Sequence, residues 1–120
     1  MIIPSGGFRI FLASEPVDFR KGMDGLVAHI AGQFDLDPFD GAIWIFRSRR
    51  ADRLKLIVWD GTGLVLVLKR LEDGRFVWPK PQSGLPSGPL TLSKVQFEAL
   101  FAGMDWRNLP VATAQRPVLV

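Results

Sequence analysis

The chain has 120 residues, which is the size of a single domain built around one hydrophobic core. Its apolar fraction of 48% and charged fraction of 22% are ordinary for a globular protein, and the absence of cysteine excludes disulfides, thiolate catalysis and zinc–thiolate sites. No apolar run approaches the roughly 18 residues of a membrane-spanning helix, and the N-terminus lacks a signal-peptide pattern. We therefore expect a cytoplasmic protein without membrane contact.

The first part of the chain predicts a strand followed by an amphipathic helix. Residues 8–13 (FRIFLA) are almost entirely apolar, as in a buried strand. After Ser14-Glu15-Pro16, apolar residues recur at helical spacing and would share one face of a helix. These residues are Phe19, Met23, Leu26, Val27, Ile30 and Phe34.

The sequence allows two alternatives for the start of this helix. Asp18 is a candidate N-cap. However, two glycines in the following turns each weaken a helix by about 1 kcal/mol, so the regular helix could begin nearer Asp24. Residues 18–21 would then form a loop that holds Arg20 and Lys21 outward as a second anion contact.

Residues 41–79 contain four apolar runs separated by short polar joints. Each run has four to eight residues rich in Val, Ile, Leu, Phe and Trp, which favours strands over helices. The joints contain glycines of the kind that hairpin turns require. We predict an antiparallel meander with strands at 42–47, 54–60, 64–71 and 75–78.

The C-terminal part predicts a loop, a short helix and a tail. Residues 79–89 are rich in proline and should form a loop. Ser93 and Gln96 match a capping box that opens a helix over 94–102, and residues 108–120 lack periodicity, which indicates a flexible tail.

Together these elements predict one α+β domain over residues 1–107. An antiparallel sheet of about four or five strands would be packed by one amphipathic helix and the short C-terminal helix.

The positive charge of the chain is concentrated in the predicted sheet. Between Arg47 and Lys80 there are nine basic and four acidic residues, whereas the rest of the chain has six basic and eight acidic ones. Four arginines fall within seven residues: Arg47, Arg49, Arg50 and Arg53. One alternative is a solvated loop whose arginines pair with Asp52 or lie over Trp44 and Trp59. The other is a surface for a polyanion.

Catalytic patterns are nearly absent. His29 is the only histidine and lies on the predicted helix, so the sequence gives no support for a Ser-His-Asp set around it. No glycine-rich phosphate-binding fingerprint occurs. A magnesium-dependent nuclease would need four separate carboxylates to meet, although each has a simpler local role. These carboxylates are Asp18, Asp24, Asp52 and Asp60.

Four segments resemble the TnpB-type accessory proteins, the products of the second open reading frame in the insertion sequence 66 (IS66) family. They are VDFRKGMDGL, FRSRRADRLKLIVWDGTG, KRLEDGRFVWP and LSKVQFEALFAGMDW. The resemblance runs from about Phe8 to Arg107. It implies a small accessory protein of transposition that is encoded beside a larger DDE transposase, and it does not imply a well-defined biochemical activity. We expect no metal site and no cofactor.

We therefore expect a non-enzymatic protein that binds DNA, including the element ends, and that assists the transposase. The expected primary phosphate contacts are Arg47, Arg49, Arg50, Arg53 and Lys55, and the expected secondary contacts are Arg20, Lys21, Lys69, Arg70 and Arg75. The alternative is an interaction module that binds the transposase with little DNA contact, because both faces of the predicted strands are apolar and a chain of 120 residues could leave part of the sheet uncovered.

Overall fold

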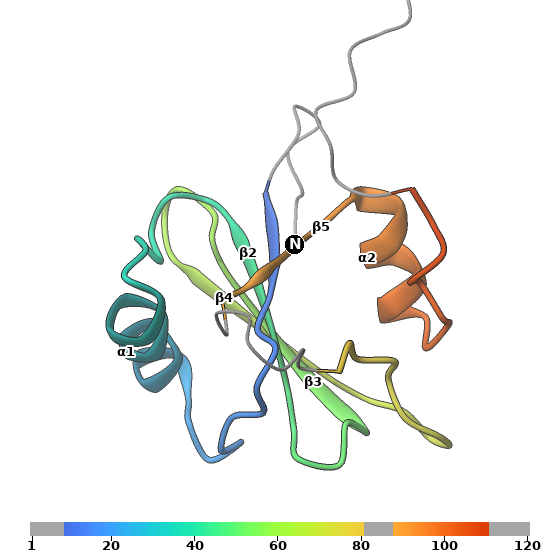
Figure 1. Ribbon diagram of the computed structural model, residues 1–120. Coiled ribbons are helices and arrows are strands. Elements are labelled where there is room, and N and C mark those ends of the chain that lie inside the picture. Colours follow the sequence, from blue (N-terminus) through green and yellow to red (C-terminus); the bar gives the residue numbers. More distant parts are fainter. Residues whose placement is uncertain (1–8, 81–87, 111–120) are drawn as a thin grey trace, which may run out of the picture.

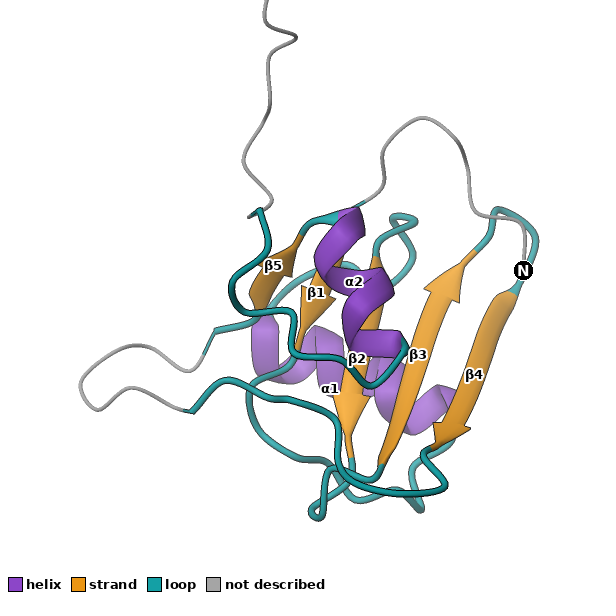
Figure 2. Cartoon of the chain, turned by 90° about the vertical axis from the view of Figure 1, so that its right-hand side faces the viewer, coloured by secondary structure: helices purple, strands orange, loops and turns teal. Residues whose placement is uncertain are grey.

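A five-stranded sheet organises the computed structural model, which describes residues 9–80 and 88–110. The strands are β1 (Ile10–Leu12), β2 (Ile43–Arg47), β3 (Arg53–Trp59), β4 (Leu64–Arg70) and β5 (Leu90–Leu92). They lie side by side in the order β4-β3-β2-β1-β5 (Figure 2). β2, β3 and β4 form an antiparallel meander, whereas β1 runs parallel to β2 and antiparallel to β5.

The two helices cover opposite faces of this sheet (Figure 1). α1 (Met23–Phe34) buries Leu26 and Ile30 against Trp44, Phe46 and Ile57. α2 (Lys94–Phe101) packs on the other face, in a cluster that includes Ile45, Leu54, Leu56, Phe97 and Leu100. The predicted α+β class is thus confirmed.

Three strands of the predicted meander are confirmed, with ends that differ by at most one residue. They are 42–47, 54–60 and 64–71, which correspond to β2, β3 and β4. The described part of the predicted strand 8–13 contains β1. The expectation of an entirely antiparallel sheet is wrong, because the chain crosses back through α1 before it forms β2, and such a connection sets β1 and β2 parallel.

The predicted fourth meander strand, residues 75–78, is wrong. The Phe76 amide donates to the Ala51 carbonyl at 2.7 Å, and the Val77 carbonyl accepts from the indole nitrogen of Trp106 at 2.8 Å. The backbone here therefore bonds to a loop and to a side chain rather than to a strand. α2 has only eight residues, and Phe76, Val77 and Trp78 cover part of the face that α2 leaves open.

The edge of the sheet opposite β4 is formed by β5, which pairs with β1. No strand was predicted there, since β5 has three residues and follows the proline-rich segment. Residues 81–87 of the predicted loop 79–89 lie outside the described residues.

The start of α1 corresponds to the second of the two sequence alternatives. Gly22 is the N-cap and makes no side-chain cap bond, so Asp18 as the N-cap is wrong and residues 18–21 form a loop. Neither α1 nor any other helix in the described part of the chain is long and apolar enough to cross a membrane.

The predicted capping box of α2 is confirmed. The Ser93 hydroxyl accepts from the Gln96 amide at 3.1 Å, and the Gln96 side chain accepts from the Ser93 amide at 2.9 Å. The same hydroxyl donates to the Pro110 carbonyl at 2.7 Å, and Leu109 packs on the core. Residues 108–110 of the predicted tail are thus held, and 111–120 lie outside the described residues.

We expect Ser93→Ala to lower the free energy of unfolding by roughly 1–2 kcal/mol, because the cap of α2 and the bond to residue 110 are lost together. Urea denaturation followed by circular dichroism measures this. Ser93→Asn, which keeps an N-cap acceptor, should recover most of the loss. Equal stability of the alanine variant and the wild type would contradict the role of the cap.

Candidate nucleic-acid interface

Three connections meet at one end of the sheet, the lower end in Figure 1. They are the β2–β3 connection, the loop before α1 and the segment after β4. The Val17 amide donates to the Arg47 carbonyl at 3.1 Å, and the Phe76 amide donates to the Ala51 carbonyl at 2.7 Å. These backbone bonds attach both outer segments to the β2–β3 connection.

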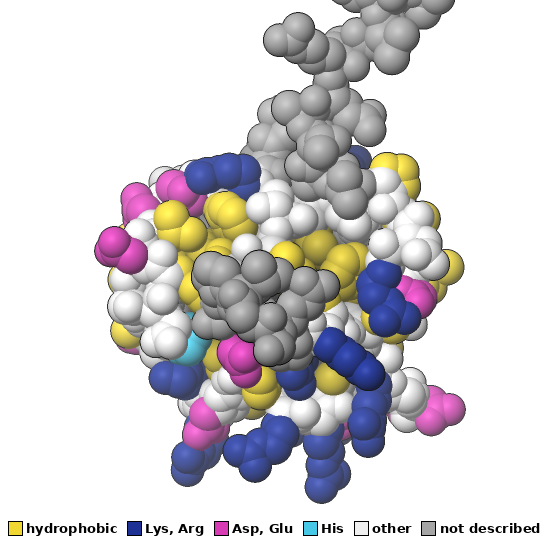
Figure 3. Space-filling model, viewed as in Figure 1, with side chains coloured by type: hydrophobic (Ala, Val, Ile, Leu, Met, Phe, Trp, Pro, Cys, Tyr) yellow, Lys and Arg dark blue, Asp and Glu magenta, His cyan; other side chains and the backbone are white. Residues whose placement is uncertain are grey.

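Basic side chains gather at this end of the molecule, as the dark blue groups in Figure 3 show. We call this surface the basic end and define it by its six exposed arginines. They are Arg20, Arg49, Arg50, Arg53, Arg70 and Arg75. Within the described residues, Arg49, Arg50, Arg70 and Arg75 form no ion pair.

The β2–β3 connection places two of these arginines at its tip. The Ala51 amide donates to the Ser48 carbonyl at 3.0 Å, which closes a turn with Arg49 and Arg50 at its two central positions. Ala51 then adopts a positive φ of 59°, which turns the chain into β3. Ser48 is buried beneath the turn and donates its hydroxyl to Asp52 at 3.1 Å. The turn is therefore fixed from below while both guanidinium groups face outward.

Arg53 and Arg70 lie directly opposite each other on β3 and β4. The adjacent Leu71 amide donates to the Asp52 carbonyl, so the Arg53–Arg70 pair is a non-hydrogen-bonded pair, the type in which facing side chains come closest. Two like charges in this relation destabilise a sheet. The nearest carboxylate to Arg53 is that of Asp52, at 3.9 Å, which is a weak, exposed pair. This cost would be relieved by an anion bound between the two arginines.

Arg20 is held by Asp18 of the same loop. Its guanidinium donates to both carboxylate oxygens, at 2.6 and 3.1 Å, and the Arg20 amide donates to one of them at 2.9 Å. The side-chain bonds from Arg20, followed by its backbone bond, lower the pKa of Asp18 from the ordinary value of 3.8 to about 2. A phosphate that approaches Arg20 must compete with this carboxylate.

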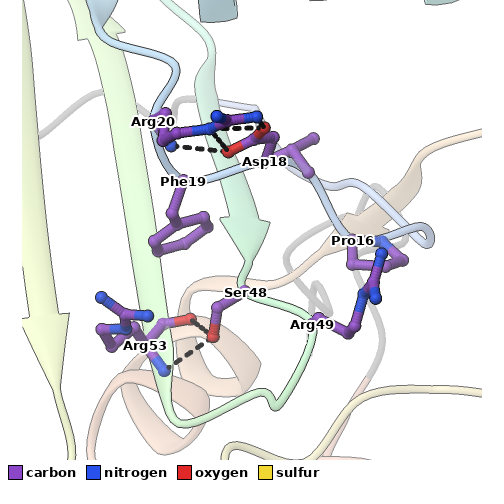
Figure 4. Close-up of a pocket in the computed structure, with 8 residues that line it drawn as sticks. Pro16, Asp18, Phe19, Arg20, Ser48, Arg49 and Arg53 are labelled. Carbon is purple, nitrogen blue, oxygen red and sulfur yellow. Dashed lines mark hydrogen bonds and ion pairs between the residues drawn. The ribbon is translucent and has the colours of Figure 1, made fainter.

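A pocket of about 570 Å³ lies between this loop and the β2–β3 connection. In Figure 4 the ring of Phe19 points between the Arg20–Asp18 pair on one side and Ser48 and Arg53 on the other. The guanidinium carbon of Arg53 lies 5.7 Å from the centre of the Phe19 ring. Arg49 and Pro16 form the remaining wall. The pocket thus combines three guanidinium groups with one carboxylate and one aromatic ring.

Lys55 was predicted to contact a phosphate, and the structure places it inside the protein. Only 8% of the residue is exposed, and its ammonium donates to the carbonyls of Phe19 and Lys21, both at 2.7 Å. It also lies 4.9 Å from the centre of the Phe19 ring. The charge is therefore engaged inside the protein and attaches the loop of residues 18–21 to β3. Sequence reasoning missed this role because the two carbonyls precede Lys55 by more than thirty residues.

Arg47 and Lys69 lie on the α2 face of the sheet, away from the outward side of the basic end. Arg47 donates to the Arg49 carbonyl at 3.2 Å, and its guanidinium carbon lies 6.0 Å from the Trp78 ring. The Lys69 ammonium donates to the Phe101 carbonyl and lies 4.3 Å from the ring of that residue. Both side chains are half-buried supports, and Lys21 is half-buried in the loop before α1.

The four carboxylates considered for magnesium are not brought together. Asp52 and Asp60 flank opposite ends of β3, and the Asp60 carboxylate accepts from the amides of Thr62 and Gly63. Across residues 9–80 and 88–110, no group of three or more acidic or histidine side chains could hold a metal ion.

Comparison with known proteins identifies the family of this chain. The chain matches the family described as IS66 Orf2 like protein over residues 8–110. It is 44% identical over 120 residues to a Sinorhizobium fredii protein named "Uncharacterized protein y4jC", with 100% of this chain and 99% of the relative covered. A second protein of that organism, "Uncharacterized protein y4hO", is 37% identical over 108 residues, with coverage of 89% and 90%. No solved structure matches significantly.

We expect Lys55→Met to lower the free energy of unfolding by about 2–4 kcal/mol, because two buried carbonyls lose a charged donor. Lys69→Met is the matched control. Its ammonium bonds to a single carbonyl at a half-buried site, so the loss should be smaller. Urea denaturation compares the two variants. If Lys55→Met cost no more than Lys69→Met, Lys55 would not be the attachment described.

The Asp18 carboxylate should titrate with a midpoint of about 2, and Arg20→Gln should move this midpoint up toward 3.8. Since the folded-state pKa lies below the unfolded one, the stabilising contribution is complete above pH 3.8 and is lost as the pH falls toward 2. Carbon-13 chemical shifts of the carboxyl group measure the midpoint. An ordinary Asp18 midpoint in the wild-type protein would exclude the pair in solution.

Proposed function

Because the chain belongs to the IS66 Orf2-like family of insertion-sequence accessory proteins, we propose that it binds DNA through the basic end and assists a separate DDE transposase. The observation that carries this proposal is the gathering of six exposed arginines on one end of the sheet, four of them without an ion pair in the described structure. DNA is the expected polyanion of such a protein.

The facing arginines of β3 and β4 support an anion as the ligand. Arg53 and Arg70 repel each other in the free protein. A phosphate that accepts hydrogen bonds from both guanidinium groups would replace this repulsion by two charge-assisted contacts. The free energy of binding would therefore include the relief of the unfavourable Arg53–Arg70 pairing in the free protein.

The tip of the β2–β3 connection supplies the second part of the proposed contact. Arg49 and Arg50 are exposed at the tip of a turn whose flanks are bonded to the loop before α1 and to the segment after β4. We assign these side chains mainly to phosphates, which fix position and contribute the salt-dependent part of affinity. Arg20 would join them when a phosphate displaces Asp18.

Strand cleavage and joining belong to the transposase in this proposal. A second candidate function is binding to the transposase itself with little DNA contact. β4 favours it, because its apolar residues are only half covered. Co-purification with the transposase in nuclease-treated, high-salt buffer separates the two, since a contact through DNA would not survive.

We expect Arg49→Ala combined with Arg50→Ala to weaken binding to element-end DNA by about tenfold or more at low salt. The slope of log K against log salt should become shallower by roughly 1.8, because two phosphate contacts are lost. Electrophoretic mobility shifts or fluorescence anisotropy at several salt concentrations measure both quantities.

The matched control is Arg9→Ala combined with Lys94→Ala. It removes the same charge from the opposite end of the sheet, since Arg9 precedes β1 and Lys94 follows β5. The control should bind nearly as the wild type does. Equal losses in both double variants would show a response to net charge alone and would remove the basic end as the site.

A further inference from the structure

β4 forms an outer edge of the sheet (Figure 2). It pairs with β3 along all seven of its residues, and no strand in the described part of the chain pairs with its other side. An edge of this length presents a row of backbone donors and acceptors that another strand can bind.

Two hydrogen bonds show which residues present this row. The Leu71 amide donates to Asp52, and the Gly63 carbonyl accepts from Asp60, both at 3.0 Å. Backbone direction alternates along a strand, so the odd-numbered residues of β4 turn their backbone groups toward β3. The even-numbered residues therefore turn theirs to the open edge. They are Leu64, Leu66, Leu68 and Arg70.

The side chains of this edge lack the usual protection against pairing. The first five residues, 64–68, contain no charge and no proline, and the regular register with β3 has no bulge. Leu66 and Val67 are only partly covered, on the α1 and α2 faces respectively, and Leu68 is 57% exposed. The residues that pack on the two faces of the sheet therefore leave part of β4 uncovered.

We propose that the partner of this edge is a second copy of the same chain. Each β4 would pair antiparallel with the other about a twofold axis at Val67. Leu66 then lies opposite Leu68, and both have outward backbone groups, as a hydrogen-bonded pair requires. The result is one continuous ten-stranded sheet across two molecules.

The charges of β4 favour this orientation. Its basic residues, Lys69 and Arg70, lie at one end, and the turn that carries Asp60 precedes the other end. Antiparallel pairing sets Arg70 opposite Leu64, on the side of that turn. Parallel pairing in register would set Arg70 against Arg70, which is unfavourable.

The dimer has a consequence that rests on the proposed function. β4 ends at the basic end, so antiparallel pairing directs the two basic ends of the dimer in opposite directions. Such a dimer binds two separate DNA segments and bridges them, and it cannot apply both basic ends to one short duplex.

Sedimentation equilibrium of the full chain tests the dimer. We expect twice the chain mass of 13.4 kDa at micromolar concentration. Leu68→Pro removes an amide that points away from β3, so the edge strand should tolerate the change while pairing is blocked and the mass is halved. Leu68→Thr, which keeps the amide, should stay dimeric. A monomeric wild type, or a folded Leu68→Pro dimer, would overturn the proposal.

A second pair of variants tests the register even if the proline variant does not fold. Only a twofold axis at Val67 places residue 67 opposite itself. Val67→Lys and Val67→Glu should each be monomeric, because like charges then meet, and an equimolar mixture should form a dimer. If each variant alone dimerised as the wild type does, the register would be wrong.

Bridging is measured with one biotinylated and one fluorescent duplex. The wild type should retain the fluorescent duplex on streptavidin beads, and Leu68→Pro should bind each duplex without joining them. If the wild type bound no DNA, the proposed function would be contradicted, whereas the proposed dimer would not be affected. If the wild type were monomeric and retained a transposase, the transposase and not a second copy of the chain would be the partner of the β4 edge, and the proposal would be overturned.

Discussion

One buried ammonium group joins the loop before α1 to the sheet and so brings Arg20 to the basic end. The side chain of Lys55 extends from β3 to the loop before α1 and donates hydrogen bonds to two carbonyls of that loop. An ammonium inside a protein is costly unless it is fully hydrogen-bonded. The loop therefore cannot move away from β3 without leaving that charge unpaired. This contact brings Phe19 over the sheet and Arg20 to the side of the β2–β3 connection.

The remaining arginines are placed by rigid elements. Ser48 supports the turn from below, and the register of β3 with β4 sets Arg53 against Arg70. Packed side chains on both faces of the sheet hold that register, because a shift of one residue would turn every apolar group to the wrong side. The packed core therefore keeps two like-charged residues opposite each other. An anion that enters the site meets donors that are already in place.

The sequence was sufficient for the elements that have strong local signals. β2, β3 and β4 were predicted because each is an apolar run between turn-forming residues, and the cap of α2 was predicted from Ser93 and Gln96. Residues 75–78 were assigned wrongly because a segment with only three consecutive apolar residues has the same composition whether it pairs as a strand or packs as a loop. β5 is too short to show a pattern, and its pairing is decided by β1, about eighty residues earlier.

The candidate site was predictable to a similar degree. The cluster of Arg49, Arg50 and Arg53 stands out in the sequence, and the β2–β3 connection and the start of β3 place these residues at one end of the molecule. The burial of Lys55 had no local signal, since alternation along β3 alone does not reveal which loop will cover a residue. The placement of Arg53 opposite Arg70 depends on the register of β3 with β4, and composition does not reveal a register.

The place of β1 between β2 and β5 also bears on how the chain folds. The meander of β2, β3 and β4 needs only neighbouring residues to meet, whereas Ile10 reaches Leu92 across most of the chain. Contacts of such high sequence separation form more slowly than local ones, so we expect β5 to join β1 after the meander has formed. During synthesis, the side of β1 that faces away from β2 has no strand to pair with until residues 90–92 have left the ribosome.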